Sequence, residues 1–291
     1  IVESERCVIE SERRQAVDGN NFGLLNEQLS AAAFTAHPYQ WPVIGWMSDI
    51  QAWTMDDLKS HFKMGYSPSN ATMVVSGDVT FDEIVKLAEK YLEPIPSSAP
   101  PPKVRTKEPE QMGERRVVVR KFAQLPIVMM AWHTPETAHP DYYALQALET
   151  VLFSGQSSRM YRRLVDRDQI ALSVNGGSDW AFDPTLFTIT AQPKAGVDPA
   201  AVEKAVYEEI DRIKTGAVTD AELEKAKNIL ISGFYRQVRT ISGRSNAIGT
   251  YQVFFGDYHR LFTAAADFKK ITAADVQRVA KQYFTDDNRT V

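Results

Sequence analysis

The first fourteen residues place apolar and charged side chains at helical spacing, with no proline or glycine among them. At about 3.6 residues per turn, one face of this predicted helix carries Ile1, Glu5, Val8, Ile9 and Glu12. Two carboxylates thus stand in an apolar stripe. An unpaired carboxylate is costly to bury, so Glu5 and Glu12 are candidates for a metal or catalytic site. The alternative is a helix edge where both acids reach solvent or pair with arginine.

The chain contains an internal repeat, in which residues 54–73 align without a gap with residues 272–291. Thr54 and Thr272 predict helix N-caps, because each is followed three residues later by an aspartate. Each copy predicts a helix, a short turn and the start of a strand, and the first strand continues through 73–78. The copies are too far apart for a solenoid. They predict two tandem domains of one fold, the first lacking its front half.

Both ends of the chain lie within predicted elements. The sequence opens on Ile1 inside a helix, with no N-cap residue and no leading strand, and it closes at Val291 as a strand begins. We therefore expect a fragment of a longer protein, in which any site completed by upstream residues is missing from this sequence.

A proline-rich segment at 93–102 cannot form regular structure and marks a domain boundary. It divides the chain into 1–105, the C-terminal part of the first domain with its linker, and 106–291, the second domain. Strands are predicted at 117–120, 125–133, 170–176 and 186–192, and helices at 80–92, 141–153 and 157–166 and from about 199, 220, 242 and 272. This order predicts an α+β fold, with each domain a mostly antiparallel sheet carrying helices on one face.

Composition restricts the class of protein. The chain has 291 residues, a formal net charge of −4 and 44% hydrophobic residues, as in an ordinary globular protein of two domains. Neither the charge nor the scattered aromatic residues indicate a nucleic-acid partner. No apolar run approaches the roughly 20 residues of a membrane span. The lone Cys7 excludes an internal disulfide.

Four segments in order resemble the pitrilysin/insulinase-type zinc metallopeptidases, which include the mitochondrial processing peptidase and its bacterial relatives. They are Glu-Arg-x-Val-Ile-x-x-Glu-x-Arg at 5–14, His-Pro-Tyr-x-x-Pro-Val-Ile-Gly at 37–45, Tyr-x-Pro-x-Asn-x-x-x-Val-Val-x-Gly-Asp at 66–78 and Gly-Gln-Ser-Ser-Arg-Met-Tyr-Arg-Arg-Leu at 155–164. The resemblance covers the whole chain.

The resemblance implies a site built around one zinc ion. The family signature His-x-x-Glu-His, whose histidines bind zinc and whose glutamate is the base, does not occur in this sequence. We expect it upstream of Ile1. By resemblance, Glu12 is the third zinc ligand and Glu5 is an acid beside the ligands that orients them. This role would explain two acids on an apolar face.

The second domain is expected to bind no metal. Aligning the domains places Ala226 opposite Glu5 and Gly233 opposite Glu12, so both acids are missing there. Arg244 and Tyr251 share a helix face, and without the resemblance they read as an arginine stem beside a half-buried tyrosine. The family carries an Arg/Tyr pair with this spacing, which implies that they hold the substrate backbone and the oxyanion.

These features predict a zinc-dependent endopeptidase that cleaves unfolded peptides or presequences, with the present fragment inactive by itself. By resemblance, the peptide adds as a strand to a sheet edge and the protein forms a homodimer or a heterodimer with a related subunit. The alternative is a non-catalytic partner subunit, although two retained acids argue against it. A metal-free acid/base pair of Glu5 and Glu12 is disfavoured, because such pairs straddle a cleft. The sequence does not determine the compartment, and the resemblance favours the bacterial periplasm over the cytoplasm.

Overall fold

A computed structural model describes residues 2–216 and 218–291, so the expectation for Ile1 lies outside the described residues. The first part contains α1 (Val2–Arg13), η1 (Arg14–Asp18), α2 (Asn21–Ala33), η2 (Pro38–Gln40), α3 (Met47–Ala52), α4 (Met55–Gly65), η3 (Pro68–Asn70) and α5 (Phe81–Tyr91). The second contains β1 (Val128–Thr134), α6 (Tyr142–Phe153), η4 (Tyr161–Arg167), β2 (Ala171–Ser178), β3 (Thr185–Pro193), α7 (Pro199–Thr215), α8 (Asp220–Gln237), α9 (Ile241–Phe255), α10 (Arg260–Lys270), α11 (Ala273–Tyr283) and β4 (Arg289–Thr290).

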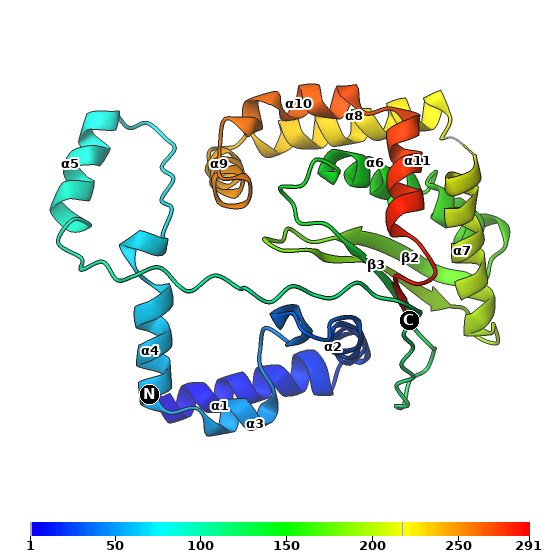
Figure 1. Cartoon of the computed structure of the whole chain (residues 1–291), viewed down its shortest axis with the longest axis horizontal. Coiled ribbons are helices and arrows are strands. Elements are labelled where there is room, and N and C mark those ends of the chain that lie inside the picture. Colours follow the sequence, from blue (N-terminus) through cyan, green and yellow to red (C-terminus); the bar gives the residue numbers. More distant parts are fainter. Residues whose placement is uncertain (1, 217) are drawn as a thin grey trace.

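One antiparallel sheet organises the molecule, with strand order β2-β3-β1-β4. Helices α6, α7 and α11 cover one face, and α2 lies on the other face (Figure 1). Met130 and Trp132 of β1 are buried in the main core, whereas Met129 and Ala131 pack with Leu29 of α2. The predicted α+β fold with an antiparallel sheet is confirmed. Because α2 adds a layer, the second-domain sheet is covered on both faces.

Both copies of the internal repeat form the predicted helix. Thr54 caps α4 and Thr272 caps α11, and each exchanges hydrogen bonds with the aspartate three residues on. The strand expected at 73–78 is not formed, since these residues have no neighbouring strand among those described. In the second copy, Arg289–Thr290, which align with residues 71–72, do form a strand, because they pair with Ala131 and Trp132.

Three other expectations need correction. Residues 117–120 form no strand, because the backbone there bonds to the chain end at only a few atoms, such as Val117 N–H to Val291 C=O at 2.8 Å. The helix expected at 157–166 is mostly the π-helical turn η4. Helix α10 was not expected, and its N-cap residue His259 makes no capping hydrogen bond with its side chain. No helix of the described residues is both long and apolar enough to cross a membrane.

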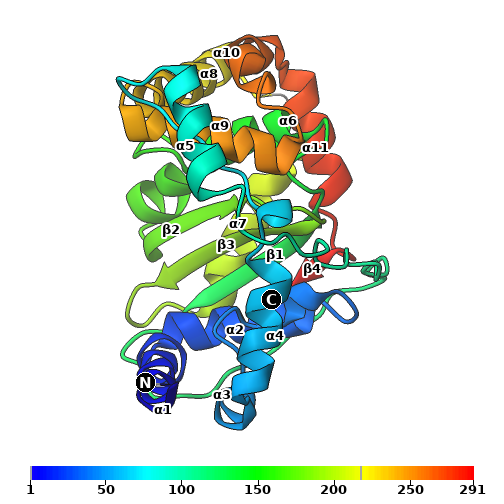
Figure 2. The same cartoon turned by 90° about the vertical axis from the view of Figure 1, so that its left-hand side faces the viewer.

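A long irregular segment connects α5 to β1 and crosses the molecule beside α2 (Figures 1 and 2). Glu108 fixes it by accepting backbone N–H bonds from Thr35 at 2.7 Å and from Ala36 and His37 at 2.9 Å each. Burial alone would raise the pKa of Glu108, but the N–H groups of His37, Thr35 and Ala36 and the Thr35 hydroxyl outweigh it and lower the pKa to about 2.

Replacing Glu108 by glutamine should destabilise the fold by about 2 kcal/mol at pH 7, because a neutral amide is a weaker acceptor and offers only one oxygen. The folded-state pKa is depressed, so the carboxylate's contribution is complete above its ordinary pKa and is lost as pH falls toward about 2. Urea unfolding should therefore show a smaller difference in the free energy of unfolding between the wild type and Glu108→Gln at pH 3 than at pH 7. A difference of the same size at both pH values would contradict this account.

Candidate functional site

The acidic residues of α1 fall into two groups. Glu3 lies 3.4 Å from Arg6 and Glu10 lies 2.8 Å from Arg14, so both are paired. Glu5 and Glu12 are exposed and form no ion pair or hydrogen bond within the described part of the chain. Val8 between them is 57% exposed, so the face expected to be buried is open in this structure. Two unpaired carboxylates thus stand on one open face of α1.

A buried arginine holds α1 in its orientation. The Arg13 guanidinium donates to both oxygens of Glu27 on α2, at 2.8 and 3.2 Å, and to the Gly45 carbonyl oxygen at 2.8 Å. Arg13 and Glu27 are both buried. Removing one member of such a pair leaves an uncompensated buried charge and typically costs about 3–5 kcal/mol. No pattern in the sequence indicates this pair, because its members are on different helices.

The structure places Arg244 and Tyr251 on α9 but in different environments. Arg244 is exposed, and its side chain makes no hydrogen bond or ion pair within the residues described. Tyr251 is buried among aromatic rings, with its ring centre 4.9 Å from that of Phe255 and 6.1 Å from that of Trp180. Burial raises the pKa of Tyr251 far above its ordinary value, so the phenol stays protonated and can donate a hydrogen bond. In the described chain no hydrogen bond or ion pair connects this pair with Glu5 or Glu12.

A second acidic site, which was not predicted from the sequence, lies between α6 and β2. The Glu149 carboxyl faces Gly177, where an added Cβ would lie 2.8 Å from it, so a larger residue at this position would displace the carboxyl. The carboxyl borders a cavity of about 330 Å³ that is otherwise lined by polar side chains, including Asn175 and Asp179. Burial raises the pKa of Glu149 to about 7. The signal available in the sequence was an acid within an otherwise apolar helix.

The surroundings of Glu149 match the inverted zinc motif in spacing but not in ligands. Gln146-x-x-Glu149-Thr150 keeps the glutamate, whereas the two histidine positions of His-x-x-Glu-His hold glutamine and threonine. Helix α8 packs beside α6 and carries Ala226 and Gly233, the counterparts of Glu5 and Glu12. Gln146 donates to Glu149 at 3.3 Å. Among the described residues, no three His, Cys, Asp or Glu side chains gather closely enough to hold a metal ion.

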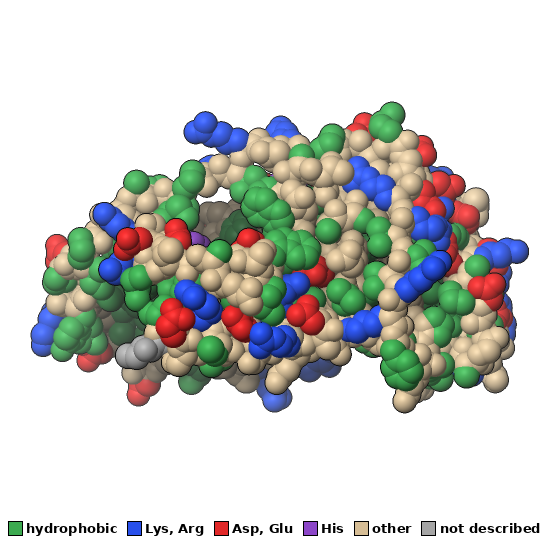
Figure 3. Space-filling model, turned by 90° about the horizontal axis from the view of Figure 1, so that it is seen from below, with side chains coloured by type: hydrophobic (Ala, Val, Ile, Leu, Met, Phe, Trp, Pro, Cys, Tyr) green, Lys and Arg blue, Asp and Glu red, His purple; other side chains and the backbone are tan. Residues whose placement is uncertain are grey.

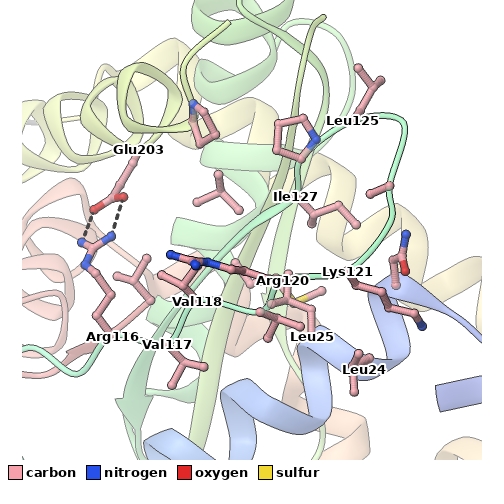
Figure 4. A pocket seen from close by; sticks show the side chains of 18 of the residues that line it. Leu24, Leu25, Arg116, Val117, Val118, Arg120, Lys121, Leu125, Ile127 and Glu203 are labelled. Carbon is pink, nitrogen blue, oxygen red and sulfur yellow. Dashed lines mark hydrogen bonds and ion pairs between the residues drawn. The ribbon is translucent and has the colours of Figure 1, made fainter. Parts of the chain in front are cut away.

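Two larger cavities lie between the first-part helices and the second domain. One, of about 550 Å³, runs between the connecting segment, Leu24 and Leu25 of α2 and the start of β1, with the Arg116–Glu203 ion pair on its wall (Figure 4). The other, of about 670 Å³, lies between α2, the loop 38–44 and residues 179–188. It has aromatic walls and shares Asp179 with the Glu149 cavity, so the two cavities adjoin.

Comparison with known families agrees with the loss of the zinc-binding histidines from α6. Residues 52–230 match the family model described as the peptidase M16 inactive domain. The chain belongs to the peptidase M16 family. The M16 match includes α6 with its altered motif, and the replaced histidines give a physical reason why this domain cannot bind zinc as the motif does.

Individual proteins and solved structures are also similar to this chain. The zinc protease PqqE of Helicobacter pylori is 32% identical over 98% of this chain, which spans 65% of that protein's length. A crystal structure of a protease from Helicobacter pylori has a TM-score of 0.95 at 30% identity, covering 99% of this chain and 70% of that one. A peptidase M16 inactive domain from Pseudomonas fluorescens has a TM-score of 0.84 at 16% identity, covering 99% and 68%, and shows the fold alone.

Replacing Glu149 by glutamine should stabilise the protein at pH 8 by about 2–3 kcal/mol and have little effect near pH 4. The folded-state pKa is raised to about 7, so the native state favours the neutral acid, and wild-type stability falls as pH rises toward that value. Glutamine resembles the neutral acid and does not titrate. Urea unfolding at both pH values tests this, with the exposed Glu110→Gln as the matched control. An equal increase in the free energy of unfolding at both pH values would be inconsistent with a buried carboxyl that titrates in this range.

Proposed function

We propose that this chain is part of a zinc-dependent endopeptidase that cleaves unfolded peptides or presequences. The observation that carries the proposal is the pair of unpaired carboxylates, Glu5 and Glu12, on one open face of α1, beside a helix face whose acids are paired with arginines. Glu12 would be the third zinc ligand, and Glu5 would orient the ligand set. In this proposal the two imidazole ligands and the catalytic base would be supplied by residues outside this sequence, so we expect the chain alone to be inactive.

A carboxylate is a suitable zinc ligand beside two imidazoles, and a bound zinc ion lowers the pKa of its water and polarises a carbonyl. The protein's own contribution is orientation. The buried Arg13–Glu27 pair fixes α1, and therefore the direction of Glu12. Arg244 and the protonated phenol of Tyr251 would donate to the peptide backbone and to the oxyanion. Because Tyr251 is buried, the proposal requires that its hydroxyl becomes accessible when substrate binds.

The peptide itself is expected to bind in extended form. Strand β2 is an edge of the sheet. Of the two adjoining cavities beside β3, one has apolar and aromatic walls, and the other is lined by Glu149 and other polar groups. An unfolded peptide can add its backbone to such an edge and place side chains in the cavities. This arrangement favours recognition of extended backbone over recognition of one folded partner.

A non-catalytic partner subunit is the second candidate. It is favoured by the match to an inactive domain and by Gln146 and Thr150 in place of the motif histidines. Such a subunit would bind peptide and complete the site of a related chain, as a heterodimer. We call the protein translated from the whole reading frame the complete protein. Its zinc content distinguishes the two candidates, because the peptidase would bind zinc and the partner subunit would not.

In the complete protein, Glu12→Gln should abolish stoichiometric zinc binding and peptidase activity, because it replaces a charged ligand by a neutral one. Glu5→Gln should weaken zinc binding by roughly 10–100-fold, as is typical when a group orienting the ligands is lost. Zinc content by mass spectrometry and cleavage of a quenched unfolded peptide measure both effects.

Glu10→Gln is the matched control, since Glu10 lies on the same helix but is paired with Arg14. It should leave zinc content and activity unchanged. Full zinc content and activity in the Glu12→Gln protein would rule out the proposed ligand. A zinc-free wild-type protein that gains activity only with a second chain would favour the partner subunit.

A further inference from the structure

The turn between α8 and α9 carries basic side chains that no neighbouring acid in the sequence neutralises. Residues 225–256 contain no aspartate or glutamate, although the chain has 37 acidic residues in all. Arg236 lies near the end of α8, Arg239 in the turn and Arg244 near the start of α9. Their side chains are exposed and form no ion pair or hydrogen bond within the part of the chain that is described. We call these three residues the arginine corner.

Elsewhere in the structure, many arginines are paired with acids. On the face of the molecule seen in Figure 3, acidic and basic side chains lie beside one another, and on α1 Arg6 pairs with Glu3 and Arg14 with Glu10. In the second domain, ion pairs are formed by Arg116, Arg159, Arg163, Arg278 and Arg289. The arginine corner is therefore a local excess of positive charge on a chain whose formal net charge is −4.

The arginine corner lies within reach of the sheet edge at which a peptide is proposed to bind. The β2–β3 hairpin extends toward α9 (Figure 1), where the ring centre of Trp180 is 6.1 Å from that of Tyr251 and 5.5 Å from that of Phe254. The helix from Tyr251 back to Arg244 is about 10 Å long, a distance that about three residues of extended peptide span. A peptide that continues past the end of β2 can therefore reach the corner.

The sheet also indicates which part of the peptide would do so. All three strand pairs are antiparallel, so a peptide added to β2 in the same way places its N-terminal part beyond Ser178, the last residue of β2. Glu149 and Asp179 border the polar cavity beside β2, and like charges disfavour acidic side chains there. Acidic side chains that pair with the corner would therefore precede the segment that pairs with β2.

We propose that the arginine corner binds acidic side chains in the N-terminal part of the peptide substrate, and that the substrates are acidic unfolded peptides rather than basic presequences. Guanidinium groups suit this role, because each stays charged and offers several N–H donors to a carboxylate. Presequences are rich in arginine and poor in acids, so they would meet like charges at the corner. This inference rests on the proposed function, since it assumes that a peptide binds at the edge of β2.

Binding of fluorescent peptides to the complete protein, followed by anisotropy with a zinc chelator present to prevent cleavage, tests the proposal. The peptides share a neutral extended segment, and the residues before it are three glutamates, three glutamines or three lysines. The glutamate peptide should bind about tenfold more tightly than the glutamine peptide, because three exposed ion pairs contribute roughly twofold each. The lysine peptide should bind more weakly than the glutamine peptide.

Reversing two charges of the corner, by Arg236→Glu with Arg239→Glu, should abolish the preference for the glutamate peptide and make the lysine peptide bind most tightly. The matched control is Arg105→Glu with Arg162→Glu, which changes the net charge equally at two exposed arginines outside the corner. The control should keep the wild-type preference. All four side chains are exposed, so both proteins should fold, which circular dichroism checks.

The position of the glutamates tests the geometry. Moving them to the C-terminal end of the peptide should remove the gain in affinity, because that end would lie toward the start of β2. General electrostatic attraction does not imitate the expected result, because a net charge of −4 favours the lysine peptide.

Equal binding of the three peptides would overturn the proposal and leave the proposed function standing. A glutamate preference that survives the reversal of Arg236 and Arg239, or that does not depend on the position of the glutamates, would overturn it in the same way. Failure of every peptide to bind would instead overturn the peptide-binding function on which the inference rests.

Discussion

The structure depends on one constraint, which is that strand β1 must be covered on both faces. Met130 and Trp132 pack against α6, α7 and α11, and Met129 and Ala131 pack against α2. Helix α2 comes from the first part of the chain, so burial of a single strand joins the two parts. Polar contacts support it, since the Arg115 side chain and His133 Nε2 both contact the Ala33 carbonyl at the end of α2. Without this cover, the apolar outer face of the sheet would be exposed to water.

Elements whose signals are local could be predicted from the sequence. The capping pairs at Thr54 and Thr272 set the starts of α4 and α11, and alternation in 186–192 predicted β3. The strand at 73–78 failed for a physical reason, because a strand requires a hydrogen-bonded neighbour and a sequence pattern does not provide one. Helix α10 was missed because it begins without a side-chain cap.

The candidate site was predictable to a similar extent. Helical spacing placed Glu5 and Glu12 on one face, and the family resemblance, not the spacing, gave them roles. Spacing could not show that the face is open or that Tyr251 is buried among aromatic rings. The contacts of Arg13 and Glu149 join residues distant in sequence. Arg13 contacts Glu27 of α2, and Glu149 lies against Gly177 of β2. Such contacts require the tertiary arrangement.

The buried pair of Arg13 and Glu27 has a geometrical consequence for α1. Each residue step along a helix corresponds to about 100° of rotation, so a helix with one open face takes its angular position from the contacts on its other side. In α1 these contacts include the Arg13 guanidinium, held by two carboxylate oxygens and the Gly45 carbonyl. Glu12 directly precedes Arg13 in the chain, so its direction follows from that of its neighbour. A charge pair on the inner side of α1 thus sets the angular position of the carboxylates on the outer side.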